Sequence, residues 1–146
     1  MRKYWCLPAL LIAPAVAADH PNLSGTWQLD AGRSQIHESK VKTETLEIQQ
    51  VEDSVQIAED SNIGGKDRKS QYQCLADGSM CKAKDLSVMV YYNGPALVLM
   101  EMRKNNEIVL KKRLTASNDG KTLNMELIHV APTGLKDESL TFVKQK

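Results

Sequence analysis

The strongest constraint on the fold of this chain is an alternation of apolar and polar residues with a period of two. In the segment Thr43–Val51, Leu46 and Ile48 fall on one face, and Glu47 and Gln49 fall on the other. A period of two is that of a β-strand, in which successive side chains point to opposite faces. Past the N-terminal residues, no window of useful length shows the 3.6-residue period of an amphipathic helix. The pattern therefore predicts an all-β protein.

Turn sequences divide the chain into about ten short strands. Asn93-Gly94 is the strongest of them, because a two-residue hairpin turn needs residues that tolerate positive φ. The expected strands are Ser24–Leu29, Thr43–Val51, Val55–Ile57, Lys69–Cys74, Met80–Lys84, Leu86–Tyr92, Ala96–Arg103, Glu107–Thr115, Lys121–Val130 and Glu138–Val143. Their short links favour an antiparallel meander, since a parallel crossover needs a dozen or more residues.

A long meander exposes two strand edges, and closing it into a barrel removes them. We therefore predict an antiparallel up-and-down meander that closes into a barrel of about 8–10 strands, without helix after the N-terminal leader. An open sandwich of two sheets is the alternative.

The first residues have the form of a cleavable signal peptide, predicted over residues 1–18. Arg2 and Lys3 precede the apolar stretch Trp5–Ala17, and small residues allow cleavage after Ala17 or after Ala18. The stretch is shorter than the ~20 apolar residues that span a membrane, so we expect no membrane span after cleavage. Residues 19–146 form the predicted single barrel domain, periplasmic or secreted, in a Gram-negative bacterium.

Charge and cysteine content agree with this interpretation. Cleavage removes Arg2 and Lys3 from the 19 basic residues and leaves the 18 acidic ones, a balance that argues against nucleic acid as a partner. Only Cys74 and Cys81 remain in the mature chain, and an isolated pair in an oxidising compartment indicates a disulfide. The spacing lacks the C-x-x-C form of redox-active pairs.

The residues that carry most enzyme chemistry do not occur in useful arrangements. The three histidines, His20, His37 and His129, lack the spacing of metal ligands. No serine has a nucleophile elbow, and Gly64-Gly65 has no helix after it to bind a phosphate. We therefore predict a protein that is not an enzyme and needs no cofactor or metal.

Gly25-Thr26-Trp27, on the first predicted strand, resembles the opening signature of the lipocalin and avidin-like (calycin) superfamily. The resemblance implies an exported lipocalin-like barrel whose floor is closed by Trp27. It also implies a basic partner over the indole, for which Arg113 is the first choice and Lys111 or Arg103 the alternatives. No segment remains for the C-terminal helix of typical lipocalins.

The predicted hairpin 86–102 is apolar on both faces, whereas a half-buried strand alternates. Its in-phase residues are a predicted apolar pocket or interface: Val88, Val90, Tyr92, Leu97 and Leu99. The second face would pack under another segment, contact a second copy in a homodimer, or bind another partner. Further along, Lys112 lies between Leu110 and Leu114, so it points either into the barrel, where it could meet an anionic head group, or outward.

The leading interpretation is an exported barrel that binds a small, partly apolar molecule of unknown identity in its interior. A small barrel can also be filled by its own side chains. The alternative is a protein-binding module similar to exported protease inhibitors, which would act through the N-terminal arm Asp19–Leu23.

Overall fold

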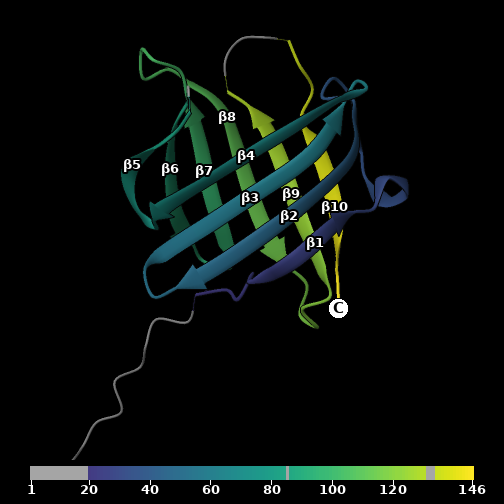
Figure 1. The fold of residues 1–146 in the computed structure, drawn as a ribbon, viewed down its shortest axis with the longest axis horizontal. Helices are drawn as coiled ribbons and strands as arrows, with labels where there is room; N and C mark the ends of the chain where they lie inside the picture. The colour runs from purple at the N-terminus through teal and green to yellow at the C-terminus, as the bar shows by residue number, and fades with distance from the viewer. Residues whose placement is uncertain (1–19, 85, 131–133) are drawn as a thin grey trace, which may run out of the picture.

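The structure is a computed structural model that describes residues 20–84, 86–130 and 134–146. Its ten strands form one antiparallel sheet that curls into a nearly closed barrel (Figure 1). The predicted all-β, up-and-down fold is confirmed, and one continuous sheet excludes the sandwich. The predicted leader, residues 1–18, lies outside the described residues.

Several strands, above all the third and the fourth, are longer than the sequence pattern indicated, because polar positions continue them past their apolar residues, while others are one or two residues shorter. They are β1 (Gly25–Leu29), β2 (Val41–Val51), β3 (Ser54–Ile63), β4 (Lys66–Leu75), β5 (Asp77–Ala83), β6 (Leu86–Asn93), β7 (Ala96–Met102), β8 (Ile108–Ala116), β9 (Thr122–His129) and β10 (Glu138–Lys144). Within the described ranges, the helical content is one 3-10 turn, η1 (Ala31–Arg33).

The order of the strands in the sheet is β4-β3-β2-β1-β10-β9-β8-β7-β6-β5. The first and last strands therefore pair with each other, with Trp27 opposite Lys144. The hydrogen-bonded ladders end at β4 and β5, which follow each other in the chain. No ladder joins these two strands in the part of the chain that the structure describes.

A disulfide between Cys74 of β4 and Cys81 of β5 crosses the seam between the two edge strands, with the Cα atoms 5.6 Å apart. Cys74 is buried and belongs to the hydrophobic core. Because backbone hydrogen bonds do not hold this seam, the covalent link and the packing of side chains hold it instead.

We expect a reducing agent to lower the free energy of unfolding by about 2.5 kcal/mol, the entropy that closing so short a loop removes from the unfolded chain. Chemical unfolding with and without reductant measures this change. The double variant Cys74→Ala, Cys81→Ala is the control and should not respond to the reductant. An equal response from that variant would show that the reductant acts elsewhere.

Alternate side chains of the strands fill the barrel interior. On β2, for example, Leu46 and Ile48 are buried, while Glu47 and Gln49, which alternate with them, are exposed. Side chains that are fully buried and bulky gather near one end of the barrel, among them Trp27, Leu123 and Phe142. We call this end, where the described chain begins, the floor. The opposite end, uppermost in Figure 1 and carrying the turns after β3 and β7, is the mouth.

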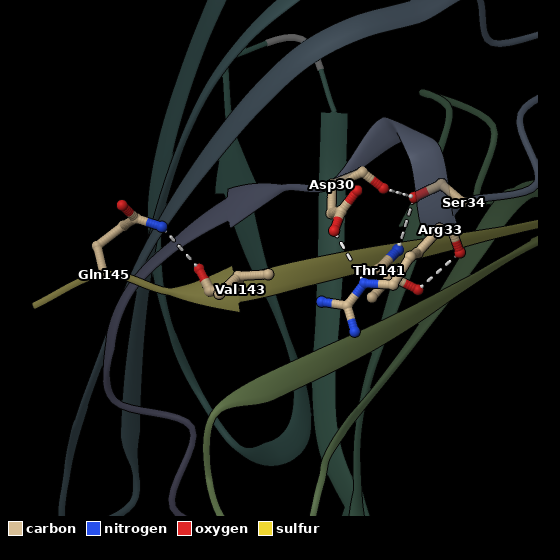
Figure 2. A network of polar contacts seen from close by, with 6 residues as sticks. All are labelled: Asp30, Arg33, Ser34, Thr141, Val143 and Gln145. Atoms are coloured by element: carbon tan, nitrogen blue, oxygen red, sulfur yellow. Dashed lines mark hydrogen bonds and ion pairs between the residues drawn. The ribbon is translucent and has the colours of Figure 1, made fainter.

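The connection from β1 to β2 is fastened to β10 by a polar network around η1 (Figure 2). Ser34 Oγ donates to the carbonyl oxygen of Asp30 at 2.7 Å and accepts from the backbone N–H of Thr141 at 2.9 Å. The Thr141 hydroxyl donates to the carbonyl of Arg33 at 3.1 Å, and Arg33 Nε binds the Asp30 carboxylate at 2.8 Å. The network extends the β1–β10 contact beyond the end of β1.

The chain segment between β1 and β2 then runs beside β10 towards the mouth. Gln35 forms an isolated bridge with Ser139. Glu138, which is 3% exposed, accepts hydrogen bonds from the backbone N–H groups of His37 (2.5 Å) and Ser39 (3.3 Å) and from the Ser39 hydroxyl (2.8 Å). Residues 37–39 are thereby held at the rim of the mouth.

Candidate functional site

Four charged side chains point into the barrel from four different strands. Glu44 on β2, Glu59 on β3, Glu101 on β7 and Lys112 on β8 each stand in phase with the buried apolar residues of their own strand. Glu44 and Lys112 are both only 8% exposed. We call these four residues the interior charge cluster.

Lys112 lies at the centre of the cluster. Its Nζ is 2.9 Å from Oε1 and 3.2 Å from Oε2 of Glu59, and 3.0 Å from Oε1 of Glu101. Because β3 and β8 are far apart in the sheet order, the bond to Glu59 crosses the barrel. Burial alone would lower the pKa of Lys112, but the attraction of Glu59 and Glu101 outweighs it and raises the pKa well above the usual value. Lys112 is therefore a permanent cation.

Glu44 has a different environment. Its carboxyl group forms no hydrogen bond or ion pair with any of the residues the structure describes. Burial raises the pKa of Glu44, the charge of Glu59 adds to the rise, and the attraction of Lys112 opposes it, so that the pKa lies at about 7. Glu101 adds a weaker repulsion. Glu44 thus exchanges its proton near neutral pH.

A hydroxyl group also faces the cluster. Tyr72 of β4 is 6% exposed, and its Oη is buried without a hydrogen-bond partner among the described residues. Burial raises the pKa of Tyr72, and this hydroxyl interacts electrostatically with the four members of the interior charge cluster. The phenol is therefore a neutral polar group with free hydrogen-bonding capacity.

A cavity of about 140 Å³ lies beside the cluster on the mouth side and is partly open. Glu44, Glu59 and Lys112 contribute charged groups to its wall, and Ser39 and Ser61 contribute hydroxyls. The rest of the wall is apolar: Val41, Ile63, Leu110, Met125, Leu127 and Leu140. A dry cavity of about 150 Å³ holds a benzene molecule, so this one matches a ligand of similar size.

A larger hollow, of about 490 Å³, lies mainly over the outer surface of β2, β3 and β4. Its wall includes the exposed side chains Glu47, Lys69 and Gln71. An open surface of solvated charges offers little apolar contact to a small ligand. The interior cavity is therefore the better site.

The basic residue over Trp27 is not the one that the resemblance implied. Trp27 is fully buried, and its Nε1 donates to the carbonyl of Leu23 at 2.9 Å. The cation over the indole is Lys144, 5.4 Å from the ring centre. Arg113, the partner predicted first, lies on the outer face of β8 and pairs with Glu126 at 3.3 Å. The correction follows from strand order, since barrel closure places β10, and not β8, beside β1.

The described part of the N-terminal arm is bound to the floor. The Gln50 side chain accepts a hydrogen bond from the backbone N–H of Leu23 at 2.5 Å. Its amide nitrogen donates to the carbonyl oxygen of Pro21 at 2.9 Å and to the Tyr92 hydroxyl at 2.8 Å. His20 stacks on Tyr92 with ring centres 4.0 Å apart. The arm is thus packed against its own barrel, and its action on a protease stays a prediction. Asp19 lies outside the described residues.

The predicted apolar hairpin residues fill the interior of the barrel. Val88, Val90, Leu97 and Leu99 are buried in the core, and Tyr92 packs against it, half-buried. None of these residues lines the 140 Å³ cavity. The outer face of the hairpin is also apolar, because Ala96, Val98 and Met102 are buried there outside the core cluster. A homodimer through residues 86–102 stays a prediction.

Sequence reasoning left open whether Lys112 points inward, and the structure shows that it does, already paired with two carboxylates. It missed Glu44 and Glu59 as site residues, and it favoured a solvated or surface-paired side chain for Glu101, which instead pairs with Lys112 inside the barrel. The signal was present: each of these glutamates occupies an in-phase position on its strand, as Glu44 does with Leu46. A charged residue at such a position is buried unless the strand ends before it.

The Glu44 carboxyl should make the stability of the fold depend on pH. Its pKa is about 7 in the folded protein against an ordinary value of 4.5, so the folded state holds a proton that the unfolded chain releases between these values. We expect the free energy of unfolding to fall by about 3 kcal/mol as pH rises through this range. Urea unfolding from pH 4 to pH 8 measures the change.

Glu44→Gln should remove this dependence and be more stable than the parent at pH 8. Glu47→Gln, an exposed position on the outer face of the same strand, is the matched control and should keep the parent profile. Identical profiles for the parent and Glu44→Gln would contradict the assignment.

No protein-family model and no curated protein matches the chain. Several solved structures do. Human cRBP IV has a TM-score of 0.58 at 17% identity and covers 85% of this chain and 98% of its own. Apo lipid binding protein 8 of Caenorhabditis elegans has a TM-score of 0.56 and 16% sequence identity. The match covers 84% of this chain and 95% of that protein. Fatty-acid-binding protein 1 of Echinococcus granulosus has a TM-score of 0.58 and 10% sequence identity. The match covers 84% of this chain and 97% of that protein.

At these identities the likeness shows the fold alone, which is an antiparallel β-barrel. Two further observations bear on the predicted partners and metals. No helix in the described ranges is long and apolar enough to cross a membrane. The same residues contain no group of three or more His, Cys, Asp or Glu side chains arranged to hold a metal ion.

Proposed function

We propose that this protein binds one small, partly apolar molecule in the cavity at the mouth of its barrel and acts by binding, without catalysis. The observation that carries the proposal is the partly open 140 Å³ cavity, whose wall is largely apolar and includes the carboxyl group of Glu44, which is unpartnered among the described residues. Ligand sites in proteins combine these two features, although most are larger.

The comparisons support this proposal through the fold. The similar structures include proteins titled lipid binding and fatty-acid-binding, so the barrel suits an apolar ligand. The remaining interior of this chain is filled by its own side chains. The ligand we expect is therefore closer in size to a substituted benzene ring than to a long-chain lipid.

Binding can be tested with benzyl alcohol, a neutral probe that matches the cavity in size, by ligand-observed NMR on the full chain. Val41→Phe places a ring in the cavity wall and should abolish binding. Val51→Phe, at the exposed far end of the same strand, should leave binding unchanged. If Val41→Phe fails to fold, Ile63→Phe blocks the same cavity. Equal binding by the parent and both blocked variants would overturn the proposed site.

We also propose export to the periplasm or the medium. The predicted leader and the Cys74–Cys81 disulfide support it, because such bonds persist in oxidising compartments. The intact mass of the protein isolated from its own host tests it. A chain that begins at Ala18 or Asp19 is expected, and an uncleaved chain would contradict export by this leader.

A further inference from the structure

We propose that the cavity selects a small organic cation, a protonated amine, which Glu44 binds through its carboxylate, and that it rejects carboxylates of the same size. This inference rests on the proposed function and names the ligand class. It is carried by the juxtaposition of an unpartnered buried carboxyl, an adjacent cavity and a lysine that is already neutralised.

The charge balance of the site favours a cation. Lys112 is the one basic member of the interior charge cluster, against three carboxyl groups. Once Glu44 is ionised, the cluster carries an excess of negative charge in a region with little solvent. A buried charge without a partner is costly. An ammonium group beside Glu44 would reduce this excess, whereas a carboxylate would increase it.

Lys112 is poorly placed to receive an anion. An ammonium group has three N–H donors, and this one already contacts both oxygens of Glu59 and one oxygen of Glu101. An incoming carboxylate would have to displace one of these two partners and leave it buried without a cation. Such a loss costs far more than a surface ion pair gains.

Glu44 is, by contrast, ready to accept. It is buried, it lines the cavity, and its carboxyl has no partner among the described residues. The Tyr72 hydroxyl, also buried and unpartnered within the described ranges, adds a second free polar group at the cluster. The hydrocarbon part of an amine would lie against the apolar wall, which includes Leu110, Met125 and Leu127.

The negative charge of the site would favour an organic cation over a fatty acid. Among the similar structures is one titled fatty-acid-binding protein, and a fatty acid presents a carboxylate. The interior charge cluster would repel that group. The shared fold and the proposed ligand class are thus compatible, because the fold supplies the barrel and the inward-facing residues decide the charge of the ligand.

The test uses three probes of nearly equal size on the full chain: benzylamine, benzyl alcohol and benzoate, measured by calorimetry at pH 8 and low salt. We expect benzylamine to bind at least about tenfold more tightly than benzyl alcohol, the effect of one charge-assisted contact. Benzoate should bind more weakly than the alcohol. This comparison needs no variant.

Glu44→Gln should reduce the affinity for benzylamine to that for benzyl alcohol and leave the alcohol unchanged. The matched control is Glu126→Gln, a half-exposed carboxylate on the outer face that pairs with Arg113, which should leave all three probes unaffected. The affinity of the parent for benzylamine should rise about tenfold from pH 6 to pH 8, as Glu44 loses its proton and the amine keeps its own. The ionisable groups facing Glu44 are Glu59, Glu101, Lys112 and Tyr72.

The outcomes separate the two proposals. Benzoate binding at least as tightly as benzylamine would overturn the ligand class, and so would unchanged benzylamine affinity in Glu44→Gln. Benzyl alcohol binding that Val41→Phe abolishes, without preference for the amine, would keep the proposed function and overturn only this inference. Failure of all three probes would overturn both.

Discussion

Replacing Lys112 with methionine should lower the free energy of unfolding by about 3–5 kcal/mol, the cost of leaving buried charges without their partner. The side chain is nearly isosteric along its stem, so packing changes little and the loss is chiefly electrostatic. Glu59 and Glu101 would then lose the cation with which both now form ion pairs. Their negative charges would repel each other and that of Glu44. Chemical unfolding at pH 7 measures the loss.

The loss in Lys112→Met should shrink as pH falls, because unpaired buried carboxyls take up protons more readily in the folded state. Arg113→Met is the matched control. It removes the neighbouring cation on the outer face, which pairs with Glu126; both side chains are more than a third exposed. The free energy of unfolding should therefore fall by only about 0–1 kcal/mol. Similar losses for the two variants would show that the interior charge cluster has no special energetic role.

Trp27→Ala should destabilise the fold by about 3–5 kcal/mol, as expected when a fully buried indole leaves a cavity behind. Trp27 is the largest of the fully buried side chains. Its removal also leaves the carbonyl of Leu23 without the indole N–H, so the segment just before β1 loses an anchor. Thermal and urea unfolding measure the effect.

Trp27→Phe distinguishes the two contributions, because it keeps an aromatic ring and loses the hydrogen bond and part of the volume. We expect a smaller loss than in Trp27→Ala. Lys144→Met removes the cation over the ring and should cost no more than about 1 kcal/mol, the usual strength of an exposed cation–π contact. A loss below about 1 kcal/mol in Trp27→Ala would be inconsistent with a closed floor.

The strands and turns could be predicted because they depend on local chemistry. Asn93-Gly94, the strongest turn signal, lies at the tip of the β6–β7 hairpin. Polar stretches were harder. The composition of residues 61–67, with two glycines, is typical of a loop, yet only Gly64 and Gly65 form the turn, and paired strand residues lie on both sides of them. Polar residues pair as well as apolar ones when both sheet faces there are solvated.

The candidate site was less predictable because it depends on which strands meet across the barrel. That Lys112 could point inward followed from its place between two leucines. That it would meet Glu59, 53 residues earlier in the chain, depends on closure and strand tilt, which no local pattern reports. The partner of Trp27 was missed for the same reason, since Lys144 lies beside it only because the chain ends pair.

That pairing of the chain ends has a consequence for how the protein folds. Every other ladder joins strands that are neighbours in sequence and can form as a hairpin, whereas β1 and β10 bring together residues more than 100 positions apart. Closing so long a loop costs entropy before any contact repays it, and contacts of this kind slow folding. The final closure of the barrel therefore awaits β10, which is synthesised after the other nine strands.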